Sequence, residues 1–509
     1  MAEIDALPGA AIGAPSALSA LKVRPDDDVA VALRDIAEGE MVEAGGARVR
    51  AAGAIPRGHK LALKPVAEGA LVRKYGFPIG LASADIAPGD HVHEHNLKSA
   101  LSGPQEYAFA PAPRAALMAG QGSFQGYRRA NGRVGVRNEI WILTSVGCVT
   151  RTAERLAKLG AEKFGAHIDG VHAFTHPFGC SQLGEDLGRT RKIIAGLAAH
   201  PNAGGVLIVG LGCESNQIDA LMKAAPGLDP ERVRAFKAQD EEDEIETGMA
   251  LMGELAARMA HDKRETCTVS DLVIGVKCGG SDAFSGLTAN PLVGAISERV
   301  AAAGGRAVLT EIPEIFGAET MLLERAQSRA VFDQAVAVVN DFKQYFLDHG
   351  QAVHENPSPG NRAGGITTLE EKSLGAVQKG GRAPLCQVLR YGEQASAPGL
   401  ILLEAPGNDA VSSTALAAAG AAIILFTTGR GTPLGFPAPT LKIASNSALA
   451  LRKANWIDFD AGQLLAGVSA EDAADSLFAL VLETASGRAT KAEINDEREI
   501  AIWKTGVTL

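Results

Sequence analysis

The sequence has no apolar run long enough to cross a membrane and no extended block of basic residues. A membrane-spanning helix needs roughly 18–20 consecutive apolar residues, and the 509 residues contain no such run. The formal net charge is −10, whereas binding to nucleic acid phosphates needs a basic face. We therefore expect neither a membrane nor a nucleic acid among the partners.

The sequence also lacks a secretion signal and is poor in cysteine. Residues 1–20 are rich in alanine, glycine and proline, without the basic start and apolar core of an export signal. Six cysteines in so long a chain do not form a disulfide framework. We expect a reducing, cytoplasmic location, in which the thiols are core residues, metal ligands or catalytic groups.

No segment matches a nucleotide-binding signature. TTGRGTP (427–433) is glycine-rich and follows an apolar run, but neither it nor LGCESNQ fits a Walker A motif or a dinucleotide fingerprint. We expect no nucleotide cofactor. The 427–433 loop could still present backbone N–H groups to an anion.

The chain is too long for one hydrophobic core, and its patterns change along its length. We expect a flexible lead at 1–22 and a small β-rich domain at 23–100, where short β-type runs alternate with glycine turns. Residues 101–125 have no periodicity and are predicted to be a linker. Alternating strand and helix patterns predict two α/β domains with mainly parallel sheets, at 126–264 and 265–509.

Four predicted strands end in a cysteine beside glycine: Cys148, Cys180, Cys213 and Cys278. Ligands of open α/β sheets bind outside the carboxyl ends of the strands, so we expect these cysteines to line one crevice. They could hold an iron–sulfur cluster, bind a single metal ion or pack as small apolar residues. Their wide spacing gives no support for a cluster, without excluding one.

Histidines are concentrated in the predicted β-rich domain, at His59, His91, His93 and His95. In a strand, residues two apart point to the same face. The HVHEH segment could therefore form a metal-binding ridge with His59 nearby, since imidazole suits iron, manganese and zinc. A solvated edge strand or turn is the alternative.

Acid–base and anion-binding candidates occur elsewhere in the chain. His176, in THPFGC, precedes Cys180 by four residues, where a general acid or base would be useful. Arg137 and Asn138 belong to the arginine-rich YRRANGRVGVRNE segment, and Arg430 lies in TTGRGTP. Arginine can grip a carboxylate through two parallel hydrogen bonds; a solvated basic turn is the alternative.

A long polar segment at 350–375 contains Asn361 and Lys372. Loops of this length within a compact domain are usually functional or disordered. The segment could be a mobile lid that brings these two side chains to a substrate, or a surface loop.

Several long motifs resemble, in order, those of the altronate/galactarate dehydratase family. They are GYRRANGRVGVRNEIWILTSVGCV, FTHPFGCSQLGED, HPNAGGVLIVGLGCESNQ, KCGGSDAFSGLTANP, ENPSPGNRAGGITTLEEKSLG, APGNDAVSSTALAAAG and TTGRGTP. IPRGHKLALKPVAEGALVRKYGFPIGLASADIAPGDHVHEHN resembles the SAF module of that family, a small β-clip domain. The likeness runs from about residue 23 to residue 509. HVHEHN and IDFDAGQL look closer to the altronate branch than to the galactarate branch.

The resemblance implies a hydro-lyase that converts D-altronate to 2-keto-3-deoxy-D-gluconate and water, with Fe²⁺ or Mn²⁺ and without a cluster. The partner is then a small sugar acid, and the chain could act as a homo-oligomer. From the residues themselves we assign His59 and His93 to the metal. The catalytic candidates are His176, Lys372 and Cys180, and the substrate-binding candidates are Arg137, Asn138, Asn361 and Arg430.

Three alternative functions remain at this stage. The nearest is the same reaction on galactarate or another aldarate. The same domains could also serve a sulfolactate-type lyase that cleaves a carbon–sulfur bond. A non-enzymatic carbohydrate-binding protein is the third, although a binding module needs neither the cysteine tips nor the polar 350–375 segment.

Overall fold

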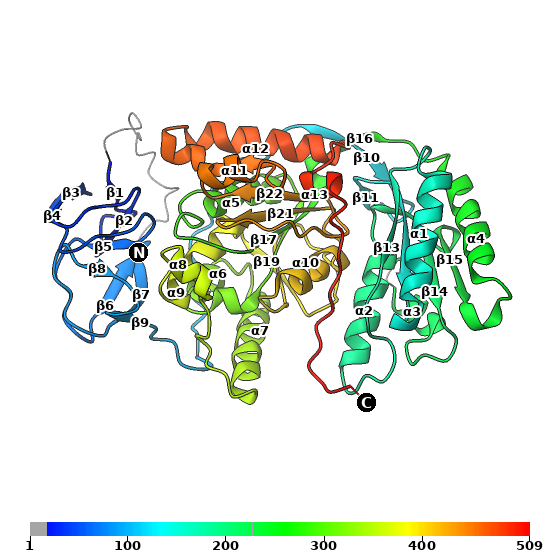
Figure 1. Ribbon diagram of the computed structural model, residues 1–509, viewed down its shortest axis with the longest axis horizontal. Coiled ribbons are helices and arrows are strands. Elements are labelled where there is room, and N and C mark those ends of the chain that lie inside the picture. The colour runs from blue at the N-terminus through cyan, green and yellow to red at the C-terminus, as the bar shows by residue number, and fades with distance from the viewer. Residues whose placement is uncertain (1–17, 226, 509) are drawn as a thin grey trace.

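The computed structural model describes residues 18–225 and 227–508, which form three domains in a row (Figure 1). The domain formed by the C-terminal part of the chain lies between the other two in space and is called the central domain. The domain that comes second in the sequence lies at the end opposite the N-terminal domain and is called the middle domain. Of the expected lead at 1–22, residues 1–17 lie outside the described residues, and Ala20–Leu21 form the first strand. Residues 101–122 have neither helix nor strand and run along the central domain toward the middle domain. They form hydrogen bonds to Asn340 and Glu324 of the central domain.

The N-terminal domain consists of short antiparallel strands, as the sequence predicts. They pair in the orders β1-β2-β5-β8, β3-β4 and β6-β7-β9. The strands are β1 (Ala20–Leu21), β2 (Val29–Ala32), β3 (Met41–Ala44), β4 (Ala47–Arg50), β5 (Lys60–Ala62), β6 (Leu71–Lys74), β7 (Phe77–Ala82), β8 (His91–Val92) and β9 (Leu97–Lys98). Alternating burial along β3 and β6 is the period-2 pattern of strands with one face toward a core.

The middle domain has a four-stranded parallel sheet in the order β13-β12-β14-β15. These strands are β12 (Glu139–Thr144), β13 (Gly170–Phe174), β14 (Ala203–Gly210) and β15 (Val233–Lys237). The helices are α1 (Thr150–Phe164), α2 (Asp186–Ala198), α3 (Ile218–Ala224) and α4 (Glu244–Met259). Helices α1 and α4 pack together, whereas α2 packs against α3 and against the central domain. A small sheet of β10 (Ser123–Arg128), β11 (Val134–Gly135) and β16 (Glu265–Thr268) joins the two α/β domains.

The central domain is built on a seven-stranded parallel sheet in the order β19-β20-β18-β17-β21-β22-β23. The strands are β17 (Val273–Cys278), β18 (Arg306–Leu309), β19 (Leu385–Leu389), β20 (Gly399–Leu403), β21 (Ile423–Thr428), β22 (Thr440–Ala444) and β23 (Phe459–Asp460). The helices are α5 (Ala289–Ala302), α6 (Glu319–Leu323), α7 (Arg329–Asp348), α8 (Pro359–Ala363), α9 (Leu369–Ala376), α10 (Asp409–Ala418), α11 (Ser447–Arg452), α12 (Ala470–Ala485) and α13 (Lys491–Ile494). The predicted α/β class with parallel sheets is therefore confirmed.

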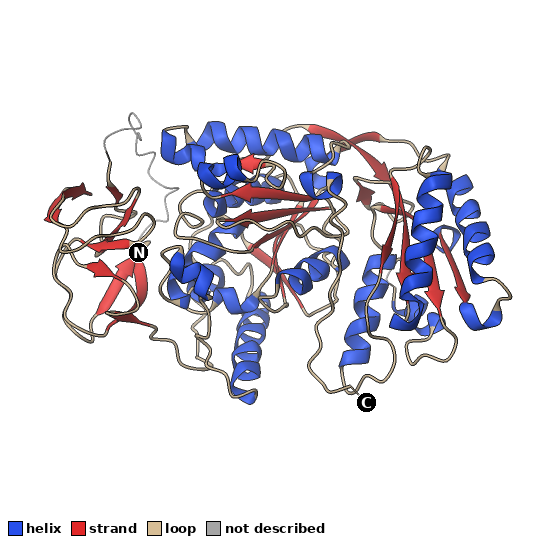
Figure 2. Ribbon diagram, viewed as in Figure 1, coloured by secondary structure: helices blue, strands red, loops and turns tan. Residues whose placement is uncertain are grey.

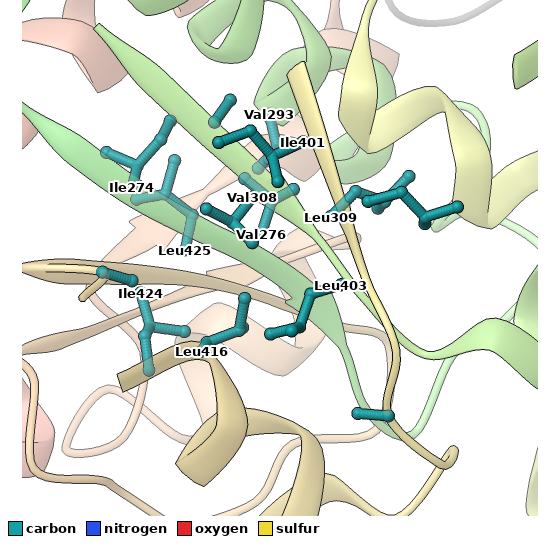
Figure 3. Packing of buried hydrophobic residues seen from close by; sticks show 14 of the residues in the cluster. Ile274, Val276, Val293, Val308, Leu309, Ile401, Leu403, Leu416, Ile424 and Leu425 are labelled. Carbon is teal, nitrogen blue, oxygen red and sulfur yellow. The ribbon is translucent and has the colours of Figure 1, made fainter. Parts of the chain in front are cut away.

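Aliphatic side chains fill the space around the central sheet (Figure 3). Val276 and Val308 come from neighbouring strands, and Val293 of α5 and Leu416 of α10 cover them. Near-continuous apolar runs are typical of parallel strands, because helices bury both faces of such a sheet. Among residues 18–225 and 227–508, no helix has the length and apolar character that a membrane crossing requires.

The two parallel sheets point their carboxyl ends in different directions (Figures 1 and 2). The strands of the central sheet end toward the N-terminal domain. The strands of the middle-domain sheet end at the lower edge of the view, beside the C-terminal end of the chain. The fold therefore provides two separate carboxyl edges at which chemistry-bearing side chains can gather.

Candidate functional site

The first candidate site lies where α8 and α9 fill the space between the N-terminal and central domains. These helices belong to the polar 350–375 segment, which we predicted to be a lid or a surface loop. All eight residues of α9 are buried, and Thr368 caps its N-terminus by accepting a hydrogen bond from the Glu371 N–H. The surface-loop interpretation is wrong for α9, because the segment is a packed bridge between two domains.

The histidines of the N-terminal domain gather at this bridge, as the sequence predicts. Strand β5 pairs with β8, which brings His59 to His91, with 3.0 Å between His59 Nδ1 and His91 Nε2. The ring centroids of His59 and His93 are 4.8 Å apart, and those of His91 and His95 are 5.4 Å apart. Burial, followed by the neighbouring histidines and Lys60, lowers the pKa of His91 and of His93 to about 4. These imidazoles are therefore neutral near pH 7 and able to bind a metal or accept a proton.

A cavity of about 510 Å³ opens beside these rings. Its lining comprises His59, His93, Glu94, Glu355, Pro357, Ser358, Pro359, Arg362 and Ala363. Arg362 bonds Glu94 and the Pro357 carbonyl oxygen, so a guanidinium group sits at the cavity wall. His93 Nδ1 lies 2.8 Å from the Thr367 hydroxyl, which fixes the orientation of the ring.

A buried ion triad fastens the N-terminal domain to α9. Lys60 of β5 and Lys74 of β6 each place their ammonium nitrogen 2.8 Å from a carboxylate oxygen of Glu371. Lys60 also donates to the Thr367 hydroxyl and to the Gly365 carbonyl oxygen. Although burial alone would raise it, the two ammonium groups lower the pKa of Glu371 to about 2.

Behind α9, a fully buried polar cluster lies at the end of β17. Cys278 Sγ is 2.9 Å from Glu314 Oε2 and 2.9 Å from Lys379 Nζ. Lys372 Nζ is 2.8 Å from Glu314 Oε1 and 3.0 Å from Asn356 Oδ1. Cys278, Glu311 and Glu314 offer ligand atoms that all lie within 4.8 Å of one another.

The two carboxyl groups of this cluster have pKa values shifted in opposite directions. Burial raises the pKa of Glu311 to about 7. Burial would also raise that of Glu314, but Lys372 and Lys379 lower it to about 2. Neighbouring carboxyl groups held apart in this way are typical of acid–base sites. A thiol with two carboxyl groups is also compatible with a divalent metal ion, provided that the thiol gives up its proton.

Sequence reasoning missed Glu311, Glu314 and Arg362. Both glutamates follow β18 in RAVLTEIPE, at the carboxyl end of a predicted parallel strand. That position was a usable signal, since ligands bind outside such strand ends. The strand-end rule applies to carboxylates as it does to cysteine and histidine.

The structure distributes the predicted polar residues differently. Lys372 belongs to the buried cluster, and Arg430 is exposed just after β21, with its Cβ close to Gly280. Asn361 of α8 is buried and donates to the Ser281 carbonyl oxygen, so it ties α8 to the loop that follows β17. Lys372 is thus placed for chemistry, whereas Asn361 holds the backbone around it.

Arg137 and Asn138 lie at the amino end of β12, away from both carboxyl edges. Arg137 forms a buried ion pair with Glu493, with 2.8 Å between Nε and Oε1. Asn138 Oδ1 accepts a hydrogen bond from Arg129. The expectation that these two side chains hold a substrate finds no support in this placement, because their polar atoms join parts of the fold.

His176 and Cys180 lie in the middle domain. The His176 ring is buried, with Nε2 2.9 Å from the Thr144 carbonyl oxygen and Nδ1 accepting from the Phe178 N–H. Burial lowers the pKa of His176 to about 4. Both ring nitrogens are thus engaged with backbone groups, which leaves none for a substrate in this arrangement.

The four strand-tip cysteines do not share one sheet. Cys148, Cys180 and Cys213 follow β12, β13 and β14 of the middle domain and are exposed. Cys278 ends β17 of the central sheet and is buried. The expectation of one crevice lined by all four is therefore wrong, and the strand tips divide into a group of three and a single residue.

Family models match almost the whole chain. The model described as "Altronate/galactarate dehydratase SAF domain" matches residues 18–100. "D-galactarate dehydratase/Altronate hydrolase, second domain" matches 126–260, and "D-galactarate/Altronate dehydratase, C-terminal" matches 269–508. These ranges coincide closely with the three domains of the structure.

Three relatives give the scale of the likeness. Altronate dehydratase of Escherichia coli (strain K12) is 50% identical over 96% of this chain and 99% of that protein. Altronate dehydratase of Bacillus subtilis (strain 168) is 48% identical over 96% of this chain and 100% of that protein. Galactarate dehydratase (L-threo-forming) of Escherichia coli (strain K12) is 32% identical over 85% of this chain and 86% of that protein.

Proposed function

The chain belongs to the altronate/galactarate dehydratase family, and we propose that it removes water from D-altronate to give 2-keto-3-deoxy-D-gluconate. The observation that carries the choice of substrate is the contrast between relatives. Identity is 48–50% over 96% of the chain to two altronate dehydratases, but 32% to a galactarate dehydratase. We place the reaction where the cavity between the N-terminal and central domains approaches the buried cluster behind α9: Lys372 bonds Asn356, which stands between the cavity-lining residues Glu355 and Pro357.

The chemistry requires loss of a weakly acidic proton from carbon 2, followed by loss of the 3-hydroxyl group. We assign Lys372 to protonate the departing hydroxyl. Burial lowers the pKa of its ammonium group, but Glu314 raises it more, so the net shift is upward and the group carries a proton. Lys372 replaces His176 in this role, because the His176 ring bonds backbone groups in another domain. A positioned general acid contributes roughly 10²–10⁴-fold.

Arg362 is the side chain that we assign to the substrate carboxylate. It lies on the cavity wall with His59 and His93. Its present partner is the long side chain of Glu94, which a substrate carboxylate can displace from the guanidinium group. Arg430 is a second anion candidate, at the carboxyl edge of β21. Together they replace the role first given to Arg137.

We propose that His59 and His93 bind the divalent ion, Fe²⁺ or Mn²⁺, with Glu94 beside them. Two imidazoles with a carboxylate suit non-haem Fe²⁺. His93 Nε2 lies 3.8 Å from Glu94 Oε2, but His59, His93 and Glu94 do not bring three ligand atoms within 4.8 Å of one another, so Glu94 would have to move to join the two histidines on the ion. When bound, such an ion supplies Lewis-acid stabilisation for negative charge that develops on the substrate. In the buried cluster of Cys278, Glu311 and Glu314, the carboxylates already have ammonium groups beside them, which disfavours a further dication. These groups belong to Lys277, with Nζ 3.1 Å from Glu311 Oε1, and to Lys372 and Lys379 next to Glu314.

A substrate panel tests the reaction. Anaerobically purified protein, loaded with Fe²⁺ or Mn²⁺, is offered D-altronate, galactarate and sulfolactate, and 2-keto acid release is measured. We expect kcat/KM to be highest for altronate. A preference for galactarate would overturn the substrate assignment, and no turnover of any aldonate would overturn the proposal of a sugar-acid dehydratase.

Metal analysis of variants tests the ligands. His59→Ala and His93→Ala are expected to lose both bound metal and turnover, whereas Glu314→Gln is expected to lose turnover and keep metal. If the two histidine variants retain metal and Glu314→Gln loses it, the ion belongs to the buried cluster. His167→Ala, an exposed histidine of the middle domain, is the matched control.

We also propose a cytoplasmic location. Three exposed free thiols on one domain favour a reducing compartment, since they would be oxidised elsewhere.

A further inference from the structure

Three exposed cysteines stand at the carboxyl edge of the middle-domain sheet, far from the proposed reaction site (Figure 1). Cys148 follows the central strand β12, and Cys180 and Cys213 follow its two neighbours, β13 and β14. Free cysteine is among the residue types that are most often buried, and Cys267 of this chain is buried. Packing therefore does not account for three exposed thiols at adjoining strand tips.

The loops that carry these thiols hold one another in place. The Gly147 N–H donates to the Phe178 carbonyl oxygen, and the Asn216 N–H donates to the Gly179 carbonyl oxygen. A Cβ on Gly179, which has φ 102°, would lie 2.1 Å from the Ser145 carbonyl oxygen. Such close backbone approach, available only to glycine, fixes the positions of all three tips relative to one another.

A buried carboxylate stabilises the third loop. Glu214 accepts hydrogen bonds from the Gly212 N–H at 2.6 Å, from the Leu211 N–H at 3.2 Å and from the Ser145 hydroxyl. Cys213 lies between these groups, and its sulfur is 3.7 Å from Gln239 Nε2. The Cys213 loop is thus built and rigid before any ligand binds.

Hydrogen-bond donors also face the sulfur atoms. Ser181, which has a left-handed backbone with φ 54°, places its hydroxyl 3.9 Å from Cys180 Sγ. Donors of this kind stabilise thiolates and tune iron–sulfur clusters.

We propose that Cys148, Cys180 and Cys213 bind an iron–sulfur cluster whose remaining iron position faces solvent. A single ion holds thiolates at about 2.3 Å, so its ligating sulfurs lie less than about 4.6 Å apart. Among the described residues, the three Sγ atoms do not form a group within 4.8 Å of one another, whereas Cys278 Sγ and the carboxylate oxygens of Glu311 and Glu314 do. A cluster does not require so close an approach, because each thiolate binds a different iron. This departs from the cluster-free chemistry that the family resemblance implies, and it does not depend on the proposed substrate.

Anaerobic reconstitution with iron and sulfide tests the site. We expect about four iron and four acid-labile sulfide per chain, with broad visible absorbance that bleaches in air. Cys148→Ser, Cys180→Ser and Cys213→Ser are each expected to lose most of the sulfide, whereas Cys386→Ser and Cys267→Ser keep it. Iron or zinc without labile sulfide would overturn the proposal, as would equal sulfide in all five variants.

Thiol labelling of the unmodified protein gives a second test that needs no variant to fold. After reconstitution, alkylation mapped by mass spectrometry should spare Cys148, Cys180 and Cys213 and still modify Cys386, while chelation of the iron restores labelling of all three. Unprotected tip thiols in the reconstituted protein would overturn the proposal. A disulfide between two of them after anaerobic purification would do so as well.

Discussion

Replacing Glu371 by glutamine should loosen the junction between the N-terminal and central domains. The side chains of Lys60, Lys74 and Glu371 are 0%, 1% and 1% exposed, so the variant leaves two buried ammonium groups without a carboxylate. Removing one partner of a buried ion pair costs about 3–5 kcal/mol. At about 1.4 kcal/mol per factor of ten, the folding equilibrium should shift by roughly 10²–10⁴-fold.

Urea denaturation measures this loss, and amide hydrogen exchange locates it. We expect faster exchange in β5, β6 and α9, with little change in the middle domain. Glu254→Gln is the matched control, because Glu254 bonds Arg234 at 2.6 Å with its side chain 55% exposed, and such surface pairs contribute at most about 1 kcal/mol. If the Glu371 and Glu254 variants unfold at the same urea concentration, the triad does not hold the domains together.

The same carboxylate predicts a pH dependence of stability. Its pKa is about 2 in the folded protein, against an ordinary value of 4.5, so the unfolded chain binds the proton more readily. The stabilisation from Glu371 is therefore complete above about pH 4.5 and is lost as the pH falls toward 2. Denaturation midpoints between pH 2 and pH 6 should fall less steeply in Glu371→Gln than in the unmodified protein; parallel curves would contradict this.

Three further predictions concern the sites. Arg362→Ala should raise KM for the sugar acid about 10–100-fold, as expected for a lost charged hydrogen bond, with the melting temperature unchanged; an unaltered KM would remove Arg362 from substrate binding. Gly179→Ala should lower stability by about 1–3 kcal/mol by calorimetry, because its Cβ would strike the Ser145 carbonyl oxygen, while Gly184→Ala, also at positive φ but in open space, should cost less. Turnover should fall as the pH drops toward 4, where His93 becomes protonated; a flat profile down to pH 4 would show that its neutral form is not required.

The grouping of the four histidines is the part of the candidate site that the local sequence pattern predicted. Spacing of two placed His91, His93 and His95 near one another, and the short β-type runs predicted the domain that carries them. The meeting with His59 follows from the pairing of β5 with β8. The expected ridge on one strand face is not what joins them, because β8 ends at Val92 and His93 and His95 lie in the turn that follows it. The rings still come together because the turn is short and the β-rich segment is small enough that its strands have few ways to pair.

The arginine-rich segment is where the local sequence pattern suggested a substrate-binding role that the structure does not support. Four arginines within ten residues suggested an anion site, yet Arg137 is buried against Glu493, which lies 356 positions away along the chain. No local signal identifies that partner. A guanidinium group suits a substrate carboxylate and a protein carboxylate equally well, so the residue type by itself does not distinguish the two roles.

The sequence by itself determined the domain order, the β-rich and α/β character of the domains and the strand ends at which cysteines stand, because hydrophobic periodicity and glycine turns act over a few residues. Only the tertiary structure decided that the two sheets point their carboxyl ends in different directions (Figure 1), so that Cys278 shares no crevice with Cys148, Cys180 and Cys213. It also decided that α9 buries Glu371 against Lys60, 311 positions away along the chain. Contacts of this kind depend on which distant segments pack together, and that is settled by the burial of apolar faces across the whole molecule.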